Sequence, residues 1–590
     1  MNDLVIRGGS IVDGTGAPAF TADVAISDDR IVGIGRDLGP AKRTLDAQGA
    51  VVAPGWVDIH THYDGQVTWD DQMVASASNG VTTVVMGNCG VGFAPVAKGG
   101  VQTLIELMEG VEDIPGSALH EGMPWGAWET FGEYLDVLDK RTYSLDIAAQ
   151  LAHGALRYYA MGERGAANED ATAADLARMA AMTEEAMRAG AVGFSTSRTI
   201  GHRSITGVPV PGTFAAAEEL HAIAAAMTRA GHGVFEAIAS GTVGVLEPLG
   251  GEHATTDAEI ELFADVSARS GRPLTFTCVQ INEDRDGWRR MLDASEAANA
   301  VGAQLHPQVA CRSVGFLTSL QAYHAFMRRP TYIKLAQLSL AERVAVLARP
   351  EIKEAILAEK DVPNDTPGGS GSLSGTFRRA VRSMYRMTSP IDYEPERSSS
   401  VAARAEAVGR DPLEFLYDEM LEEGGRAFFM LVGSNYGEGN LNTCREMLLD
   451  RNTVSGLSDA GAHVNFICDV SMPTFHLTHW VRDRVRGERL PIEHVVQKQT
   501  QATASLYGMT DRGVLSVGRR ADINVIDLDA LRIHVPEVLH DLPAGGSRVI
   551  QRSSGYLATI VAGAISREND ADTGLRSGRL VRGGRLPAAR

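Results

Sequence analysis

The 590-residue sequence has no long hydrophobic run and few cysteines. No window reaches the roughly 18 apolar residues of a membrane-spanning helix. The first residues, Met1 to Leu4, lack the basic segment and apolar stretch of a signal peptide. The five cysteines are odd in number and widely spaced, which suits a reducing compartment better than a disulfide framework. We therefore expect a protein of the cytoplasm without a membrane partner.

Positive charge is also scarce. Lysine and arginine number 55 against 74 aspartates and glutamates, which gives a formal net charge of -19. This balance argues against nucleic acid or an anionic membrane as the main partner. The sequence contains no P-loop, no dinucleotide-binding fingerprint and no internal repeat. Its length allows a large enzyme core and more than one domain, and a small-molecule substrate is the partner we expect.

Short β-strands separated by turn signals are predicted at both ends of the chain. Residues 1–53 contain apolar runs divided by Gly-Gly and Asp-Gly pairs. The same pattern returns at 523–526 and 558–561. Because chain termini often lie close together, we predict one small β-sandwich built from residues 1–53 and 506–565. A C-terminal tail over 566–590 follows.

Between these ends, β-rich runs alternate with helical runs, which is typical of a parallel α/β fold. The clearest helices are predicted at 175–189 and 216–229. Eight strands are the number that closes a barrel, so we predict a (β/α)8 barrel over 54–505. One gap is too long for a single crossover and predicts a largely helical insertion at 312–453. The predicted strands are 55–61, 82–88, 145–152, 191–196, 232–239, 273–280, 302–310 and 454–459.

A glycine- and serine-rich run at 367–375 lies inside the insertion. This composition is typical of a flexible linker. The insertion leaves from the seventh predicted strand, on the face where the catalytic loops of a barrel gather. We therefore expect the insertion to cover the barrel mouth, with the glycine-rich run either a plain linker or a lid over the active site.

His60 and His62 end the first predicted barrel strand. Alternate side chains of a strand share one face, so both imidazoles point the same way. Two imidazoles in this arrangement can hold one metal ion, and zinc accepts such ligands. Two histidines beside a turn can also be ordinary polar surface residues, so the other strand ends must decide between these interpretations.

Two other strand ends carry residues that favour a metal site. Cys89 follows the second predicted strand, where a thiolate would complete a His-His-Cys set and can bridge two metals; a free buried cysteine is the alternative. Asp459 ends the eighth strand, where a carboxylate beside a metal can move the proton of a bound water to a leaving amine. Its alternative role is a helix N-cap. His463 is expected either to bind substrate or to lie in the turn.

Taken together, these motifs resemble the amidohydrolase superfamily and, within it, the N-acyl-D-amino-acid deacylase (D-aminoacylase) family. The resemblance implies a metal-dependent hydrolase that cleaves the linear amide of a small N-acyl compound such as an N-acyl-D-amino acid. It also implies zinc on His60, His62 and Cys89, with Asp459 as catalytic acid/base and further ligand. One zinc is predicted and a second is left open. The matching segments are 8–16, 53–62, 80–90, 191–196, 458–463 and 511–522.

The sequence departs from this family where two further histidine ligands are expected, at the ends of the fifth and sixth strands. Our alignment puts Ile238 and Cys278 at these positions. Cys278 can replace a nitrogen ligand by sulfur, Glu236 can supply an oxygen if the alignment shifts by two residues, or both are packing residues. Two alternative functions follow: a hydrolase of cyclic amides or other small molecules, and a non-catalytic barrel with a degraded metal site.

Overall fold

The computed structural model describes residues 1–244, 246, 249–363 and 373–584. Most of the glycine- and serine-rich run at 367–375 lies outside the described residues, so its role as linker or lid stays a prediction. Within the described ranges, every helix is too short or too polar to span a membrane.

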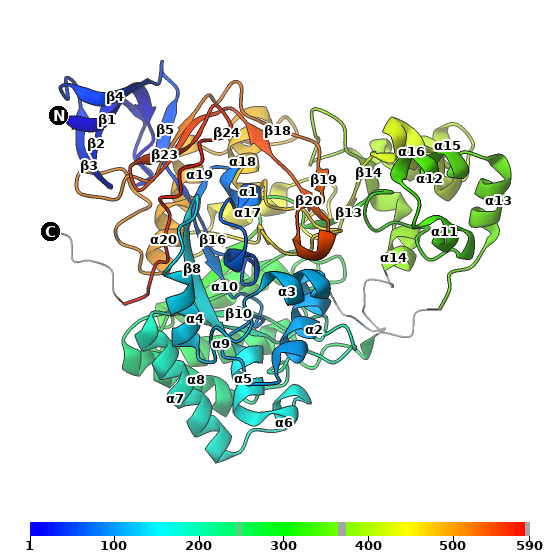
Figure 1. Cartoon of the computed structure of the whole chain (residues 1–590), viewed down its shortest axis with the longest axis horizontal. Coiled ribbons are helices and arrows are strands. Elements are labelled where there is room, and N and C mark those ends of the chain that lie inside the picture. The colour runs from blue at the N-terminus through cyan, green and yellow to red at the C-terminus, as the bar shows by residue number, and fades with distance from the viewer. Residues whose placement is uncertain (245, 247–248, 364–372, 585–590) are drawn as a thin grey trace.

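Parallel strands arranged as a barrel form the centre of the molecule (Figure 1). The barrel is nearly closed, because Thr61 bridges Ala460 and the His62 N–H donates to the Ala460 carbonyl over 2.8 Å. The predicted (β/α)8 architecture is confirmed. Within the described residues the strand order is β16 (Val454–Ser455), β12 (Leu305–Val309), β11 (Leu274–Thr277), β10 (Val234–Ile238), β9 (Gly193–Ser197), β8 (Asp146–Ala152), β7 (Val81–Met86) and β6 (Trp56–Asp58).

Helices connect these strands and cover the outside of the barrel (Figure 1). The two helices predicted most clearly are α7 (Ala173–Ala189) and α8 (Ala217–Ala230). Thr172 and Asp175 form a capping box that starts α7, and Gly190 follows its last residue. Other helices of this layer are α2 (Val101–Glu112), α4 (Phe131–Leu138), α5 (His153–Met161), α9 (Thr256–Ser270), α10 (Gly287–Ala300), α17 (Asn442–Leu449), α19 (Ile492–Gln499) and α20 (Gln501–Leu506).

Strands from the two ends of the chain join in one sheet, as predicted (Figure 1). The link between the ends is the antiparallel pairing of β5 (Val51–Pro54) with β17 (Ile523–Ile526). Buried residues of both ends, such as Ile6 and Ile560, pack in one apolar cluster. The sheet extends past residue 565. Its other strands are β1 (Asn2–Ile11), β2 (Phe20–Ser27), β3 (Arg30–Gly35), β4 (Ala41–Asp46), β22 (Tyr556–Val561), β23 (Ala564–Glu568) and β24 (Ala571–Asp572).

The insertion has its own apolar core and lies to one side of the barrel (Figure 1). Residues 312–323, the insertion root, approach the loop after β16, where the Leu317 N–H donates to the Phe466 carbonyl. The returning segment of the insertion contacts a second barrel loop, where the Asn435 N–H donates to the Gln280 carbonyl after β11. A cover formed by the insertion helices stays a prediction. Its elements include β13 (Gly315–Thr318), α11 (Pro330–Leu335), α12 (Leu340–Leu347), α13 (Pro350–Ala358), α14 (Leu373–Arg379), β14 (Met384–Arg386), α15 (Val401–Ala407), α16 (Pro412–Gly425) and β15 (Phe429–Val432).

Candidate metal centre

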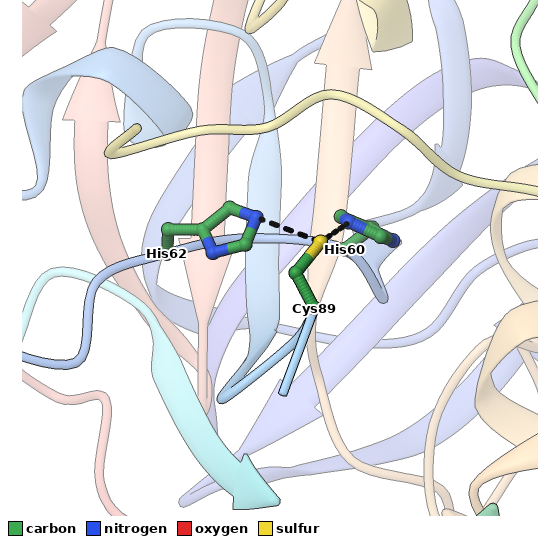
Figure 2. Close-up of side chains that lie close together, drawn as sticks. All are labelled: His60, His62 and Cys89. Atoms are coloured by element: carbon green, nitrogen blue, oxygen red, sulfur yellow. Dashed lines mark hydrogen bonds between the residues drawn. The ribbon is translucent and has the colours of Figure 1, made fainter. Parts of the chain in front are cut away.

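Side chains from the ends of β6 and β7 converge at the mouth of the barrel (Figure 2). The Cys89 Sγ lies 3.4 Å from His60 Nε2 and 3.9 Å from His62 Nε2. All three side chains are buried, and their ligand atoms lie within 4.8 Å of one another. The structure therefore brings together the histidine pair and the cysteine that the sequence singled out.

Asp459 approaches the same two imidazoles from the loop after β16. Its Oδ1 lies 3.4 Å from His60 Nε2 and 3.8 Å from His62 Nε2. In the fully described stretch after β16, the next helix, α18 (Met472–Phe475), begins only at Met472, so the alternative role of Asp459 as an N-cap is not observed. Asp459 points instead at the histidine pair.

Three residues of this site have backbone in the left-handed region. Cys89 has φ 56°, Asp459 has φ 47° and His463 has φ 50°. Side chains other than glycine adopt this region rarely and at a cost. Such backbone persists where the surrounding structure determines it, and it is typical of functional sites.

His60, His62 and Cys89 can hold one divalent metal ion, and Asp459 approaches two of these three ligands. Zinc–ligand distances of about 2.0–2.3 Å in a tetrahedron place ligand atoms roughly 3.3–3.6 Å apart, close to the separations observed here of 3.4 to 3.9 Å. Burial lowers the pKa of His60 to about 4. The pKa of His62 is also lowered, mainly by burial and to a smaller extent by the neighbouring imidazoles. Both imidazoles are therefore neutral and can offer a lone pair. Two imidazoles, a thiol and a carboxyl form a donor set that zinc accepts.

The other ring nitrogen of each histidine also has a polar neighbour. Gln308 on β12 places Oε1 3.0 Å from His60 Nδ1, and Glu112 at the end of α2 places Oε1 3.2 Å from His62 Nδ1. The Gln308 contact favours a proton on His60 Nδ1 and leaves Nε2 free for a metal. The Glu112 contact does not meet hydrogen-bond geometry, but it places an acceptor beside His62 Nδ1. Neither residue was predicted from the sequence. The signal for Glu112 is a carboxylate on the apolar face of an amphipathic helix.

Cys278 lies away from this cluster. Phe276, two residues earlier on β11, packs against Phe263 of α9, so this face of the strand points outward to the helices. The Cys278 thiol follows the same face and lies 3.8 Å from the Trp288 carbonyl oxygen of α10. The structure thus corrects the sequence alignment, which put Cys278 at a ligand position.

Glu236 on β10 points toward the cluster. Its Oε2 accepts the Cys89 N–H over 3.2 Å, and its Oε1 has no hydrogen-bond partner among the described residues. Burial raises the pKa of Glu236 to about 8. By accepting the Cys89 N–H, the Glu236 carboxyl group supports the backbone of Cys89. From the sequence, Glu236 was considered as a direct oxygen ligand of the metal.

His463 and His202 are half-buried near the metal cluster. His463 Nε2 lies 3.6 Å from Glu112 Oε2. His202, which the sequence analysis did not single out, lies in the loop after β9 with Nδ1 2.9 Å from the Ser197 hydroxyl. Burial and then the nearby His60 lower the pKa of His202 to about 4, and burial followed by His202 and His60 lowers that of His463 to about 3. Both rings are therefore neutral groups able to form hydrogen bonds.

Comparisons with known proteins identify relatives of this chain. The profile described as the amidohydrolase family matches residues 43–567. A D-aminoacylase of Alcaligenes xylosoxydans xylosoxydans is 27% identical and covers 98% of this chain and 97% of the relative. An N-acyl-D-aspartate deacylase of the same organism is 26% identical and covers 89% and 86%. A solved N-acyl-D-glutamate deacylase from Bordetella bronchiseptica, complexed with zinc and a phosphonate inhibitor, shares the fold with a TM-score of 0.61 at 22% identity, covering 98% of this chain and 99% of that one.

The family profile spans most of the chain, from the sheet of the chain ends through the whole barrel. The curated relatives match over nearly their full length. The chain therefore belongs to the amidohydrolase family, within its D-aminoacylase group, and is a metal-dependent hydrolase of amide C–N bonds.

Proposed function

We propose that this enzyme hydrolyses the linear amide of a small N-acyl compound, specifically an N-acyl-D-amino acid, with one zinc ion held by His60, His62, Cys89 and Asp459. The observation that carries the proposal is the approach of Asp459 Oδ1 to both imidazoles, at 3.4 and 3.8 Å. The names of the D-aminoacylase and N-acyl-D-aspartate deacylase relatives support the substrate class. Zinc in the related deacylase structure supports the choice of metal.

The roles of the side chains follow from their chemistry. When bound, a divalent metal polarises the scissile carbonyl and makes water a better nucleophile at neutral pH. Asp459 accepts the proton of the attacking water and delivers it to the amine that leaves. His60 and His62 stay neutral through this transfer, because burial lowers the pKa of both rings. Proton movement is therefore assigned to the carboxylate alone.

His463 and His202 are the proposed contacts to the substrate. Their loops follow β16 and β9, which stand four places apart in the strand order, so the two loops approach the barrel mouth from opposite sides. Both rings are half-buried near the metal cluster. A substrate lying between them can receive hydrogen bonds at both ends.

A substrate panel tests the proposal on zinc-loaded protein. The panel pairs N-acetyl-D-amino acids with their L-enantiomers and adds a cyclic amide of similar size. We expect release of acetate from the D-compounds at a higher kcat/KM than from the L-compounds. Ring opening of the cyclic amide without cleavage of any linear amide would overturn the proposal in favour of a cyclic-amide hydrolase.

A further inference from the structure

Glu112 is a buried carboxylate aimed at the metal centre from outside the barrel strands. It is the last residue of α2, and only 1% of its surface is exposed. Oε1 lies 3.2 Å from His62 Nδ1, and Oε2 lies 3.6 Å from His463 Nε2. Neither oxygen has a conventional hydrogen-bond partner among the described residues. The carboxyl group thus faces the imidazoles of His62 and His463.

Burial of this carboxylate is costly, and packing does not explain it. Burial first, and then the nearby carboxyl groups of Asp459, Asp64 and Glu236, raise the pKa of Glu112 well above its ordinary value. A buried carboxyl group without a hydrogen-bond partner costs free energy in either protonation state. The neighbouring buried positions of α2 are apolar, among them Leu104, Met108 and Val111. A leucine at position 112 would continue this apolar face without that cost. The contacts with the two imidazoles are the feature that explains a carboxyl group at this position.

We infer that Glu112 is a positioning residue that orients His62 for metal binding and holds His463 beside it. The inference rests on the proposed metal set, in which His62 binds through Nε2. A carboxylate at Nδ1 fixes the proton there, keeps Nε2 free and makes the ring a stronger ligand. The second oxygen holds the ring of His463, which we propose as a substrate contact. One side chain thereby sets the distance between metal and substrate.

The next residue, Asp113, fastens the same end of α2 to the surrounding loops. Its Oδ2 accepts the backbone and side-chain N–H groups of Asn465 at 3.1 Å each. Its Oδ1 accepts the Tyr323 hydroxyl of the insertion root over 2.7 Å. The pair of acidic residues therefore joins α2, the loop that carries Asp459 and the root of the insertion. This anchorage fixes Glu112 relative to both imidazoles.

The experiment measures zinc affinity by chelator competition on metal-free protein. We compare the wild type with Glu112→Gln and Glu112→Leu. Glutamine keeps a neutral acceptor for the Nδ1 proton, whereas leucine removes the acceptor. Loss of such a supporting group typically costs roughly 10–100-fold in metal affinity. We expect roughly tenfold weaker binding for Glu112→Gln and roughly 100-fold for Glu112→Leu.

Glu219→Gln is the matched control. Glu219 is equally buried and lies 2.8 Å from His153 Nε2, in the helical layer outside the barrel. We expect this variant to bind zinc as tightly as the wild type, even if it unfolds at a lower temperature. Thermal unfolding of the metal-free Glu112→Leu should not occur at a lower temperature than that of the wild type, because an apolar residue replaces a buried polar group that has no hydrogen-bond partner among the described residues.

A cobalt-loaded sample supplies a spectroscopic readout. In Glu112→Leu the sulfur-to-cobalt absorption of Cys89 should persist while the ligand-field bands shift, because one imidazole has changed its orientation. Wild-type affinity in both Glu112 variants would overturn the inference, and so would an equal loss in Glu219→Gln. A wild type that binds no zinc would instead overturn the proposed function on which the inference rests.

Discussion

Replacement of Cys89 by alanine tests whether its thiolate is a metal ligand, and Cys278→Ala is the matched control. Both thiols are buried, so both substitutions remove the same atom from packed surroundings. Only Cys89 lies beside an imidazole, with its Sγ 3.4 Å from His60 Nε2. Cys278 instead faces the Trp288 carbonyl. Comparison of the two variants therefore distinguishes the effect of losing a metal ligand from the effect of losing a packed side chain.

The size of the effect follows from the number of donors. Zinc binding to a four-ligand structural site contributes about 10–16 kcal/mol, so an equal share per donor is roughly 2.5–4 kcal/mol. About 1.4 kcal/mol corresponds to a tenfold change in a dissociation constant. Cys89→Ala should therefore raise the zinc dissociation constant roughly 100- to 1,000-fold. Cys278→Ala should leave it unchanged and cost about 1 kcal/mol of stability.

The assay combines elemental analysis of metal per chain with chelator competition, and circular dichroism checks that each variant is folded. Activity should fall with metal content in Cys89→Ala and stay near that of the wild type in Cys278→Ala. Equal zinc affinity in Cys89→Ala and the wild type would refute the assignment of the thiolate as a ligand.

Two further predictions concern stability. Burial raises the pKa of Glu394, but hydrogen bonds from an imidazole and from Arg484 outweigh it and lower that pKa to about 2, below its ordinary value of 4.5. The resulting stabilisation of about 3 kcal/mol is present above pH 4.5 and is lost as the pH falls toward 2. The free energy of unfolding of Glu394→Gln, measured with denaturant, should lack this part of the dependence on pH. Asp469→Asn leaves the buried guanidinium of Arg312 without its charge partner and should lower the free energy of unfolding by about 3–5 kcal/mol. The control Glu296→Gln removes an exposed ion pair and should change that free energy little. Equal unfolding midpoints for the two variants would contradict this prediction.

The barrel was predictable because its parallel strands are buried on both faces and therefore read as apolar runs. The strand at 81–86 and the one at 193–197 fall close to their predicted positions. The last strand was predicted to reach 459 but ends at Ser455. Leu457 and Asp459 adopt left-handed backbone, which ends the strand and is not indicated by hydrophobic pattern.

Three strands in the described part of the insertion were missed, although its helical character was predicted. β15 is an apolar run of four residues, Phe429–Val432. A run this short does not distinguish a buried strand from a segment of buried helix. Its partners, β13 and β14, lie far away in the sequence, so the pairing that stabilises all three strands is not visible in local pattern.

The candidate ligands were predictable from position, because the carboxyl ends of parallel strands meet at one edge of a barrel. His60, Cys89 and Asp459 all follow from that rule. Glu112 does not, since its contact with His62 depends on where α2 packs after a long loop. The alignment put Cys278 at a ligand position. Alternation along the strand from Phe276, which faces α9, would have put it on the outer face of the barrel.

The most direct test of the account is the turnover of Asp459→Asn, measured together with its zinc content. Asparagine keeps the shape of the side chain and an oxygen beside the two imidazoles, but it cannot accept the proton of water. The account predicts that the folded variant retains much of its zinc while kcat falls about a hundredfold to ten-thousandfold. Turnover near the wild-type rate in the zinc-loaded variant would contradict the role of Asp459 as acid/base.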